Sequence, residues 1–260
     1  MKNYSVIKYA FVGIVLLFVF SLNSMAQVAG SKQDKLVDLF VMGRFEDCYI
    51  KAAKMTESDK YKSDSEPYLW VSMCLIELSQ DPELEEFYPE EKATKDALKY
   101  GTKFKKKDDK LKSKEQDYIY DENIDFIYEL IEMGLIKGKS YLAMDNYSKA
   151  SYYYKLTSKL DPDNQECQLI NGVLYLYNKN REGQDIVDNS MDYFKQRAEA
   201  GGYEVNEKSR RAFEDGFMYY SNYLESKGNS DEAFNVIALA IKLEPKNQKF
   251  VQRYKQLSGE

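Results

Sequence analysis

Apolar residues recur along this chain at intervals of three and four, the spacing of amphipathic α-helices. The clearest stretch runs from Phe217 to Pro245, where Phe217, Tyr220 and Leu224 form one stripe and Ala233, Ile237 and Ala240 a second. Gly228 separates the stripes and Pro245 follows the second, as expected for a turn and a helix end. No alternation typical of β-strands competes with this pattern, so we expect an all-α protein.

The same spacing occurs in an earlier segment that ends at Pro162. Ala150 and Pro162 are separated by the same interval as Ala233 and Pro245. Two segments that share the positions of small, apolar and proline residues indicate an internal structural repeat.

Three other segments carry weaker forms of the pattern. One is interrupted by an acidic insertion, and another has extra residues between its two apolar stripes. A terminal helix over residues 248–257 would cap the stack, as repeat arrays require. Helix pairs are predicted near residues 30–57, 67–102, 115–162, 165–200 and 208–245.

The pattern resembles the tetratricopeptide repeat, in which W-x2-L-G-x2-Y, A-x3-F and P positions span about 34 residues. The resemblance implies an α-solenoid of stacked antiparallel helix pairs, a superhelix whose concave face holds peptides or partner segments. Residues 27–260 would then form a single helical-repeat domain. Positions off the packing stripes are the expected groove residues: Leu135, Lys139, Leu142, Asp215, Met218, Asn222 and Glu225.

Some members of this family clamp a peptide carboxylate with Lys, Arg and Asn side chains of successive helices. Lys139 and Asn222 lie at suitable places for such a clamp, but Leu135 and Met218 occupy the neighbouring ones. The resemblance therefore favours partner binding without identifying the ligand.

The first 26 residues have the organisation of a secretory signal peptide. Two lysines precede an apolar run at residues 10–20, and Ser24, Met25 and Ala26 supply small residues near a cleavage point before Gln27. An uncleaved anchor is the alternative, but crossing a bilayer takes about 20 apolar residues. We expect a cleaved signal, a periplasmic or secreted protein, and no stable membrane insertion afterwards.

Charge argues against nucleic acid as a partner. The formal charge is −6, and removing the two lysines of the signal leaves −8, which repels polyphosphates. An acidic block between Asp81 and Glu91 precedes a basic block between Lys103 and Lys114. Both blocks are expected as solvated segments that flank one helix. Alternatively, Lys105, Lys106 and Lys107 form a docking patch for an acidic partner or an anionic lipid.

The chain contains no histidine, which excludes Ser-His-Asp, Cys-His and H-E-x-x-H sites. Residues 134–140 resemble a phosphate-binding loop, but Met133 stands where the first glycine belongs and no strand precedes it. A carboxylate-dependent hydrolase is the weakest hypothesis, since no pair of acids stands out. We predict no catalytic residue, no metal, no cofactor and no enzyme activity.

Cys48, Cys74 and Cys167 all lie on apolar helical stripes, so we expect them to be buried as small hydrophobic residues. A disulfide between Cys48 and Cys74 is the alternative in an oxidising compartment. Exposed aromatic residues such as Trp70 and Tyr153 would provide stacking platforms for a sugar.

The apolar N-terminus predicts export, and the lack of histidine argues against an enzyme. The resemblance to the tetratricopeptide repeat implies a scaffold, similar to envelope proteins of Gram-negative bacteria, that holds a peptide segment or partner subunit in an envelope assembly. A carbohydrate-binding envelope protein is the alternative.

Overall fold

The computed structural model describes residues 30–259, which are helical with no β-strand among them. The predicted all-α class is confirmed for this range. The expected signal at residues 1–26 lies outside the described residues. The eleven helices, in chain order, are α2 (Asp34–Val41), α3 (Phe45–Glu57), α4 (Glu66–Ser79), α5 (Glu90–Lys112), α6 (Ile124–Leu142), α7 (Tyr147–Leu160), α8 (Gln165–Tyr177), α9 (Glu182–Ala200), α10 (Arg210–Ser226), α11 (Ser230–Leu243) and α12 (Gln248–Ser258).

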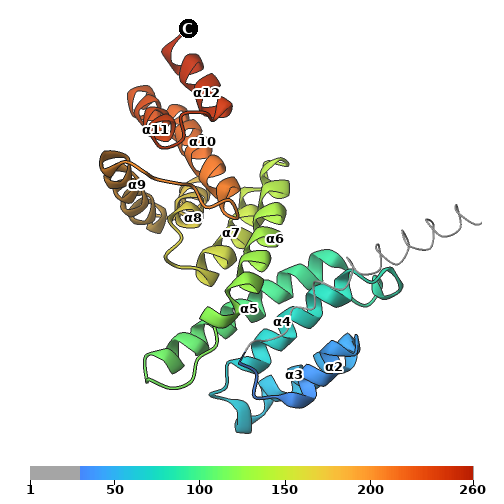
Figure 1. The fold of residues 1–260 in the computed structure, drawn as a ribbon. Helices are drawn as coiled ribbons and strands as arrows, with labels where there is room; N and C mark the ends of the chain where they lie inside the picture. Colours follow the sequence, from blue (N-terminus) through green and yellow to red (C-terminus); the bar gives the residue numbers. More distant parts are fainter. Residues whose placement is uncertain (1–29, 260) are drawn as a thin grey trace, which may run out of the picture.

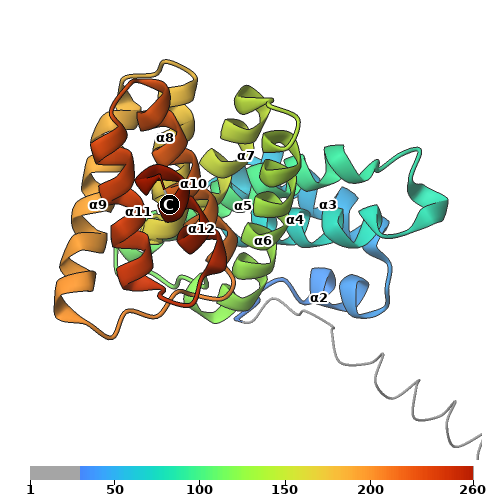
Figure 2. The same ribbon diagram turned by 90° about the horizontal axis from the view of Figure 1, so that it is seen from above.

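Helices that are neighbours in the chain pack against each other from α2 to α9 and again from α10 to α12. Between these two runs, α10 packs against α8. The molecule is consequently elongated, with α2 to α5 at one end, α6 and α7 in the middle and α10 to α12 at the other end (Figure 1, Figure 2). Among residues 30–259, no helix is both long enough and apolar enough to cross a membrane.

Turn residues and caps explain where several helices begin and end. Gly228 adopts a φ of 81° between α10 and α11, a conformation that glycine adopts without strain. The Asn146, Asn164 and Asn247 side chains accept hydrogen bonds from backbone N–H groups at the starts of α7, α8 and α12. Asparagine is among the preferred capping residues because it satisfies such unpaired donors.

α5 is longer than the sequence pattern suggested. We expected the second helix of the 67–102 pair to end near Tyr100, with the lysines outside it, whereas α5 continues to Lys112. Gly101, Phe104 and Asp108 extend its buried stripe at intervals of three and four. The sequence pattern did not predict this continuation of α5, because the charged Asp108 stands at a core position and interrupts the apolar stripe.

Two clusters of apolar side chains form the interior. The N-terminal core draws mainly on α2 to α8 and contains Trp70, the single tryptophan. The C-terminal core draws on α8 to α12 and is centred on Phe194, Phe213, Phe217 and Phe250. Ring centroids in this aromatic group are 4.9 to 6.0 Å apart, within the range of favourable aromatic contacts.

α8 belongs to both cores. Ile170 and Leu174 pack into the N-terminal core, and Leu169 and Val173 pack into the C-terminal core. On its other side, α9 approaches closely enough that a Cβ at Gly183 would lie 2.6 Å from the carbonyl oxygen of Gly172. A helix that is apolar on several sides is buried on those sides, so α8 joins the two cores.

Candidate functional site

Lys139, Tyr154 and Asp215 meet on the face predicted to be concave. The Lys139 Nζ lies 3.2 Å from Asp215 Oδ1, and the Tyr154 hydroxyl donates to Oδ2 across 3.0 Å. Burial, followed by the charge of Asp215, raises the pKa of Tyr154 well above its ordinary value. Because both oxygens of the buried carboxylate are engaged, these residues fasten α6, α7 and α10 together.

The three remaining groove candidates of α10 differ in how accessible they are. Glu225 forms an ion pair with Arg253 at 2.7 Å, and Met218 is half-buried against the C-terminal core. The Asn222 side chain is exposed and makes no hydrogen bond to another described residue. Asn222 is therefore the predicted groove residue of α10 that is most available to a partner.

The expectation that Leu135 and Leu142 line a groove is wrong. Leu135 is 0% exposed and Leu142 is 2% exposed, both within the N-terminal core. α6 packs against α5 as well as α7, so a second face of this helix is also buried. The repeat pattern reveals the contact within one pair but not the contacts that neighbouring pairs add.

The lysines expected to form one patch, Lys105, Lys106 and Lys107, point in different directions. Consecutive residues of a helix are rotated by about 100°. Lys105 is half-buried, pairs with Asp109 and lies over the Tyr120 ring. Lys106 is exposed, and Lys107 packs over the ring of Tyr68. A continuous patch made of these three lysines is therefore ruled out.

A different set of lysines surrounds a surface cavity of about 460 Å³, which we call the lysine hollow. Its positive charges are Lys62, Lys107, Lys110 and Lys114, and the half-buried Leu111 lines it with Ser63 and Gln116. Lys107, Lys110 and Leu111 follow the helical spacing of three and four on one face of α5, and Lys114 lies in the turn directly after its last residue, Lys112. Burial and then the charge of Lys110 lower the pKa of Lys107.

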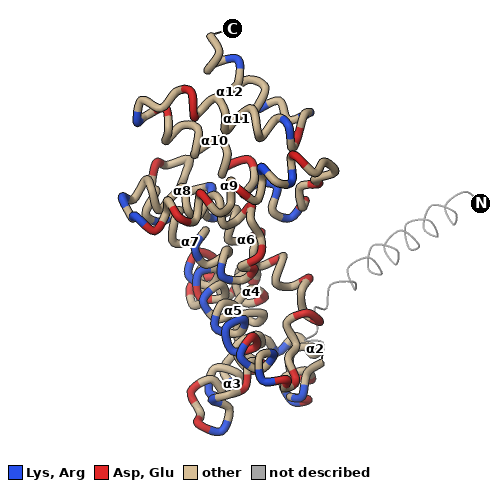
Figure 3. The backbone as a smooth tube through the Cα atoms, turned by 90° about the vertical axis from the view of Figure 1, so that its left-hand side faces the viewer, with Lys and Arg blue, Asp and Glu red and all other residues tan. Residues whose placement is uncertain are grey.

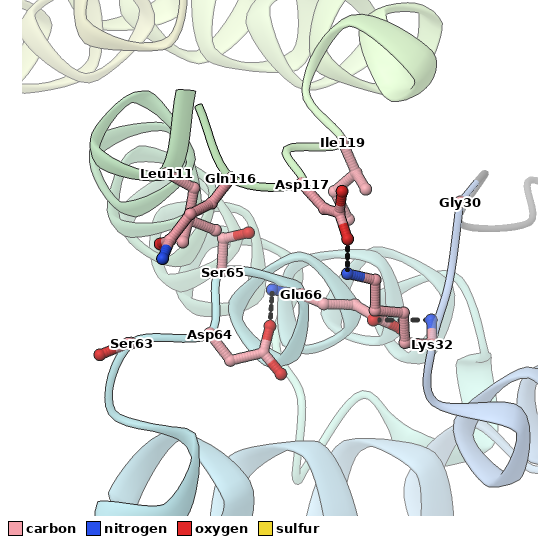
Figure 4. A pocket seen from close by; sticks show the side chains of 10 residues that line it. All are labelled: Gly30, Lys32, Ser63, Asp64, Ser65, Glu66, Leu111, Gln116, Asp117 and Ile119. Carbon is pink, nitrogen blue, oxygen red and sulfur yellow. Dashed lines mark hydrogen bonds and ion pairs between the residues drawn. The ribbon is translucent and has the colours of Figure 1, made fainter. Parts of the chain in front are cut away.

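A polar hollow of about 470 Å³ adjoins the lysine hollow and shares Ser63, Leu111 and Gln116 with it. Figure 4 shows it between the start of α4, the end of α5 and the segment that begins at Gly30. Lys32 and Asp117 face each other across it, with Nζ and Oδ2 2.6 Å apart.

Glu66 holds the base of the polar hollow together. Its Oε1 accepts hydrogen bonds from Trp70 Nε1, at 2.9 Å, and from the Ser31 hydroxyl, and its Oε2 accepts one from Lys32 N at 2.9 Å. The neighbouring Asp64 accepts from Glu66 N, at the first residue of α4, at 3.0 Å. Burial, together with the charge of Glu66, raises the pKa of Asp64.

Asp108 is a second buried anchor beside these hollows. It is 1% exposed and accepts from the Ser65 hydroxyl at 2.7 Å and from Tyr120 N at 2.8 Å. Its oxygens also lie 3.1 and 3.2 Å from Ile119 N. These bonds fix the loop after α5 onto the start of α4, so both hollows have a rigid frame.

An acidic loop, residues 80–89, lies at the opposite end of α5. It contains Asp81, Glu83, Glu85 and Glu86, and its Phe87 is 68% exposed. The next residue, Tyr88, is fixed to α3, where its hydroxyl donates to Glu46 at 3.3 Å and its ring lies 5.7 Å from that of Tyr49. The loop therefore holds Phe87 in solvent among carboxylates.

Three features of the described residues bear on catalysis. No group of three or more potential metal ligands occurs between residues 30 and 259. Asp64 and Glu66 are neighbouring acids, but hydrogen bonds within the fold occupy them. Residues 134–140 lie inside α6, where a Cβ at Gly138 would come within 2.6 Å of Tyr154. Close helix packing accounts for this glycine.

Two expectations about single residue types have different outcomes. The expectation of buried cysteines is confirmed, and Cys48, Cys74 and Cys167 are free thiols. Cys48 lies beside Cys74, and burial followed by this neighbour raises the pKa of Cys74. The expectation that Trp70 and Tyr153 are exposed stacking platforms is wrong, because both are buried against other helices.

A larger cavity of about 630 Å³ lies between α9 and α11, with Tyr220 of α10 also lining it. Asp188, Asp192, Glu232 and Lys195 line it together with apolar side chains such as Met191, and Lys195 pairs with Asp192 at 3.1 Å. The sequence pattern did not predict this cavity, because its residues come from three helices of two different pairs.

A scan against models of known protein families found no match to this chain, and a search of curated proteins found none either. The class of protein defined by the described residues is an all-α protein of sequentially packed helices, with charged hollows at one end.

Proposed function

We propose that this chain is an exported helical-repeat scaffold, a tetratricopeptide-like superhelix that holds a protein partner or peptide segment in a bacterial cell-envelope assembly. The order of helix packing is the observation that carries this proposal. Because most helices contact their chain neighbours, the molecule is long and exposes continuous faces suited to binding extended partners.

Contacts between successive helix pairs support a stacked arrangement. α7 packs on α8, α8 on α10, and α9 on α11, as expected where each pair buries its apolar face against the next. Pro162 and Pro245 each follow the end of the second helix of a pair, α7 and α11. The solenoid is thus supported by both spacing and packing.

The face of α10 around Asn222 is the proposed contact region for the partner. Asn222 is exposed, and Met218, one turn earlier on the same face, is half-buried and offers an apolar surface. An exposed amide beside a half-buried thioether side chain suits contacts with a peptide. With Trp70 and Tyr153 buried, no specific observation favours the carbohydrate alternative.

Site-specific photo-crosslinking in a Gram-negative bacterium expressing the full chain tests partner binding. A photoreactive residue at Asn222 should give one defined crosslinked protein. The same residue at Asn189, which is exposed on α9, is the matched control and should give none. Identical patterns at both positions, or no product at Asn222, would contradict the proposed contact face.

Export is tested separately. The chain should occur in the periplasmic or secreted fraction, and mass spectrometry of its N-terminus should find Gln27 as the first residue. A chain that keeps its first 26 residues and remains in the cytoplasm would contradict export.

A further inference from the structure

Opposite charges gather at the two ends of α5. The acidic loop precedes the helix and the lysine hollow lies at its C-terminal end, and Figure 1 shows α5 running across the molecule between them. α5 has 23 residues, so it is about 34 Å long at 1.5 Å per residue. Salt screens exposed charges beyond about 8–10 Å. Within one chain, these two surfaces therefore cannot neutralise each other.

Stabilisation of α5 itself explains part of this pattern. Acids at the start and lysines at the end of a helix complement its dipole, but only within the first and last turns. This accounts for Glu90, Glu91 and Lys112. It does not account for Glu85 and Glu86, which precede the helix, or for Lys62, which belongs to another segment.

The charges of both surfaces are largely unpaired. Lys107, Lys110 and Lys114 form no ion pair with any described residue, and Lys62 approaches only the fully exposed Asp59, at 4.0 Å. Glu83, Glu85 and Glu86 of the acidic loop likewise form no ion pair with any residue between 30 and 259. In Figure 3 the basic positions gather along α5. Each surface thus offers charge to a partner of opposite sign.

Apolar groups complement the charges. The loop presents Phe87, which is 68% exposed, while Leu111 lines the lysine hollow together with the lysines. Long lysine side chains cover apolar surface with their methylene groups while the ammonium group stays in water. An aromatic ring flanked by carboxylates matches a hollow of this composition.

We propose that the acidic loop of one copy of this chain docks into the lysine hollow of a second copy. Phe87 would rest on Leu111 and the lysine stems, and the loop carboxylates would pair with the surrounding ammonium groups. The two surfaces differ, so the contact is heterologous and joins chains head to tail. The inference goes beyond the proposed function, because it adds a second interface at α5, separate from α10.

Sedimentation of the purified mature chain tests this proposal. The wild-type average mass should rise with concentration, and the association constant should fall at least about tenfold between about 50 and 500 mM salt. Two charge-reversal variants, Lys110→Glu with Lys114→Glu, and Glu85→Lys with Glu86→Lys, should each remain monomeric. Mixing them should restore association, because each supplies the surface that complements the other.

Two further variants sharpen the test. Lys242→Glu with Lys246→Glu makes the same change in net charge at exposed positions of the C-terminal region and should associate like the wild type. Phe87→Ser should weaken association about tenfold if the ring anchors the contact. Far-UV circular dichroism checks that every variant remains folded.

Three outcomes would overturn the proposal. They are a wild-type chain that stays monomeric at low salt, a mixture of the two reversal variants that does not associate, and a control variant that loses association. A monomeric chain that instead binds vesicles of anionic lipid through Lys110 and Lys114 would assign the hollow to a membrane surface. Crosslinking at Asn222 succeeds or fails independently of these results.

Discussion

The two cores of this molecule are stabilised by different means. The N-terminal core is bordered by two buried carboxylates, Glu66 and Asp108, whose hydrogen bonds join segments 34 to 43 residues apart in the chain. The centre of the C-terminal core is a group of phenylalanine rings in mutual contact. Apolar packing tolerates small shifts, whereas a buried carboxylate needs each donor in place. The buried carboxylates near the start of α4 and the phenylalanine group of the C-terminal core therefore differ in how directional their contacts are, although Arg253 also bonds to Ser221 and Glu225 at the C-terminal end.

Truncating one phenylalanine of the C-terminal core should have the largest effect on stability. Phe217 is fully buried and contacts Phe194, Phe213 and Phe250, so Phe217→Ala should lower the free energy of unfolding by about 3–5 kcal/mol. Urea denaturation followed by circular dichroism measures this change. Trp70 fluorescence, a probe of the N-terminal core, should show the same midpoint because α8 belongs to both cores.

Phe87→Ala is the control for this truncation, since Phe87 is exposed, and it should change stability by less than about 0.5 kcal/mol. A Trp70 midpoint that stays at the wild-type value in Phe217→Ala, while the circular dichroism midpoint falls, would show that the cores unfold separately.

Asp108→Ala tests the hydrogen bonds of a buried carboxylate at the N-terminal core. The change leaves the Ile119 and Tyr120 N–H groups and the Ser65 hydroxyl without their acceptor. Each buried unsatisfied group costs about 1–3 kcal/mol, and relaxation of the loop recovers part of this, so we expect a loss of about 3 kcal/mol. Trp70 fluorescence during urea denaturation measures it.

Asp109→Ala is the matched control, because Asp109 is the next residue and its exposed carboxylate pairs with Lys105. It should cost less than about 1 kcal/mol. Equal losses for the two variants would show that Asp108 acts merely as a helix residue.

A substitution at Gly183 tests the close contact between α8 and α9. Alanine there would place its Cβ 2.6 Å from the Gly172 carbonyl oxygen and 2.9 Å from Leu176 N, both backbone atoms that cannot rotate away. We expect Gly183→Ala to cost about 1–3 kcal/mol by forcing α8 and α9 apart. Thermal unfolding followed by circular dichroism measures this.

Gly216→Ala provides the comparison. Its Cβ would meet the Leu169 side chain at 3.1 Å, which can adjust, and alanine favours helix by up to about 1 kcal/mol over glycine. The net change should be near zero. A larger loss for Gly216→Ala than for Gly183→Ala would contradict the idea that backbone contact limits the approach of α9.

The difference between the cores also explains what the sequence could predict. Spacings of three and four, with Gly228, Pro162 and Pro245, suffice to locate helices whose partners are close in the chain. Local periodicity cannot show that Asp108 serves as a core residue, because its donors lie in segments distant from that stripe.

The candidate sites were also predictable only where their residues are close in the chain. The lysine stripe of α5 is visible as a spacing, but the contribution of Lys62 depends on how the chain before α4 folds back. Leu135 was misplaced because α6 has neighbours on two sides, which one repeat does not reveal. A single sequence thus shows the faces of helices more readily than the cavities between them.

The smallest predicted effect is on how stability depends on pH, which should differ between a carboxyl group of the C-terminal end and one of the N-terminal end. Burial raises the pKa of Glu214 in α10, but hydrogen bonds from Lys249 and Asn247 outweigh burial, and the pKa is lowered. A lowered carboxyl pKa contributes stability above the unfolded value of 4.5 that is lost as pH falls through the folded pKa. Asp64 beside α4 has a raised pKa, mainly through burial, so its contribution has the opposite sign and is lost as pH rises.

Glu214→Gln should therefore reduce the loss of stability on acidification below pH 4.5, whereas Asp64→Asn should increase it, each by less than about 1 kcal/mol. The asparagine side-chain oxygen can still accept from Glu66 N, so the second variant removes the charge and keeps the hydrogen bond. Urea midpoints measured at several pH values for both variants and the wild type give the two slopes. For each variant, the slope is the change with pH of its stability difference from the wild type. Two slopes of the same sign would refute the assignment of opposite electrostatic roles to Glu214 and Asp64.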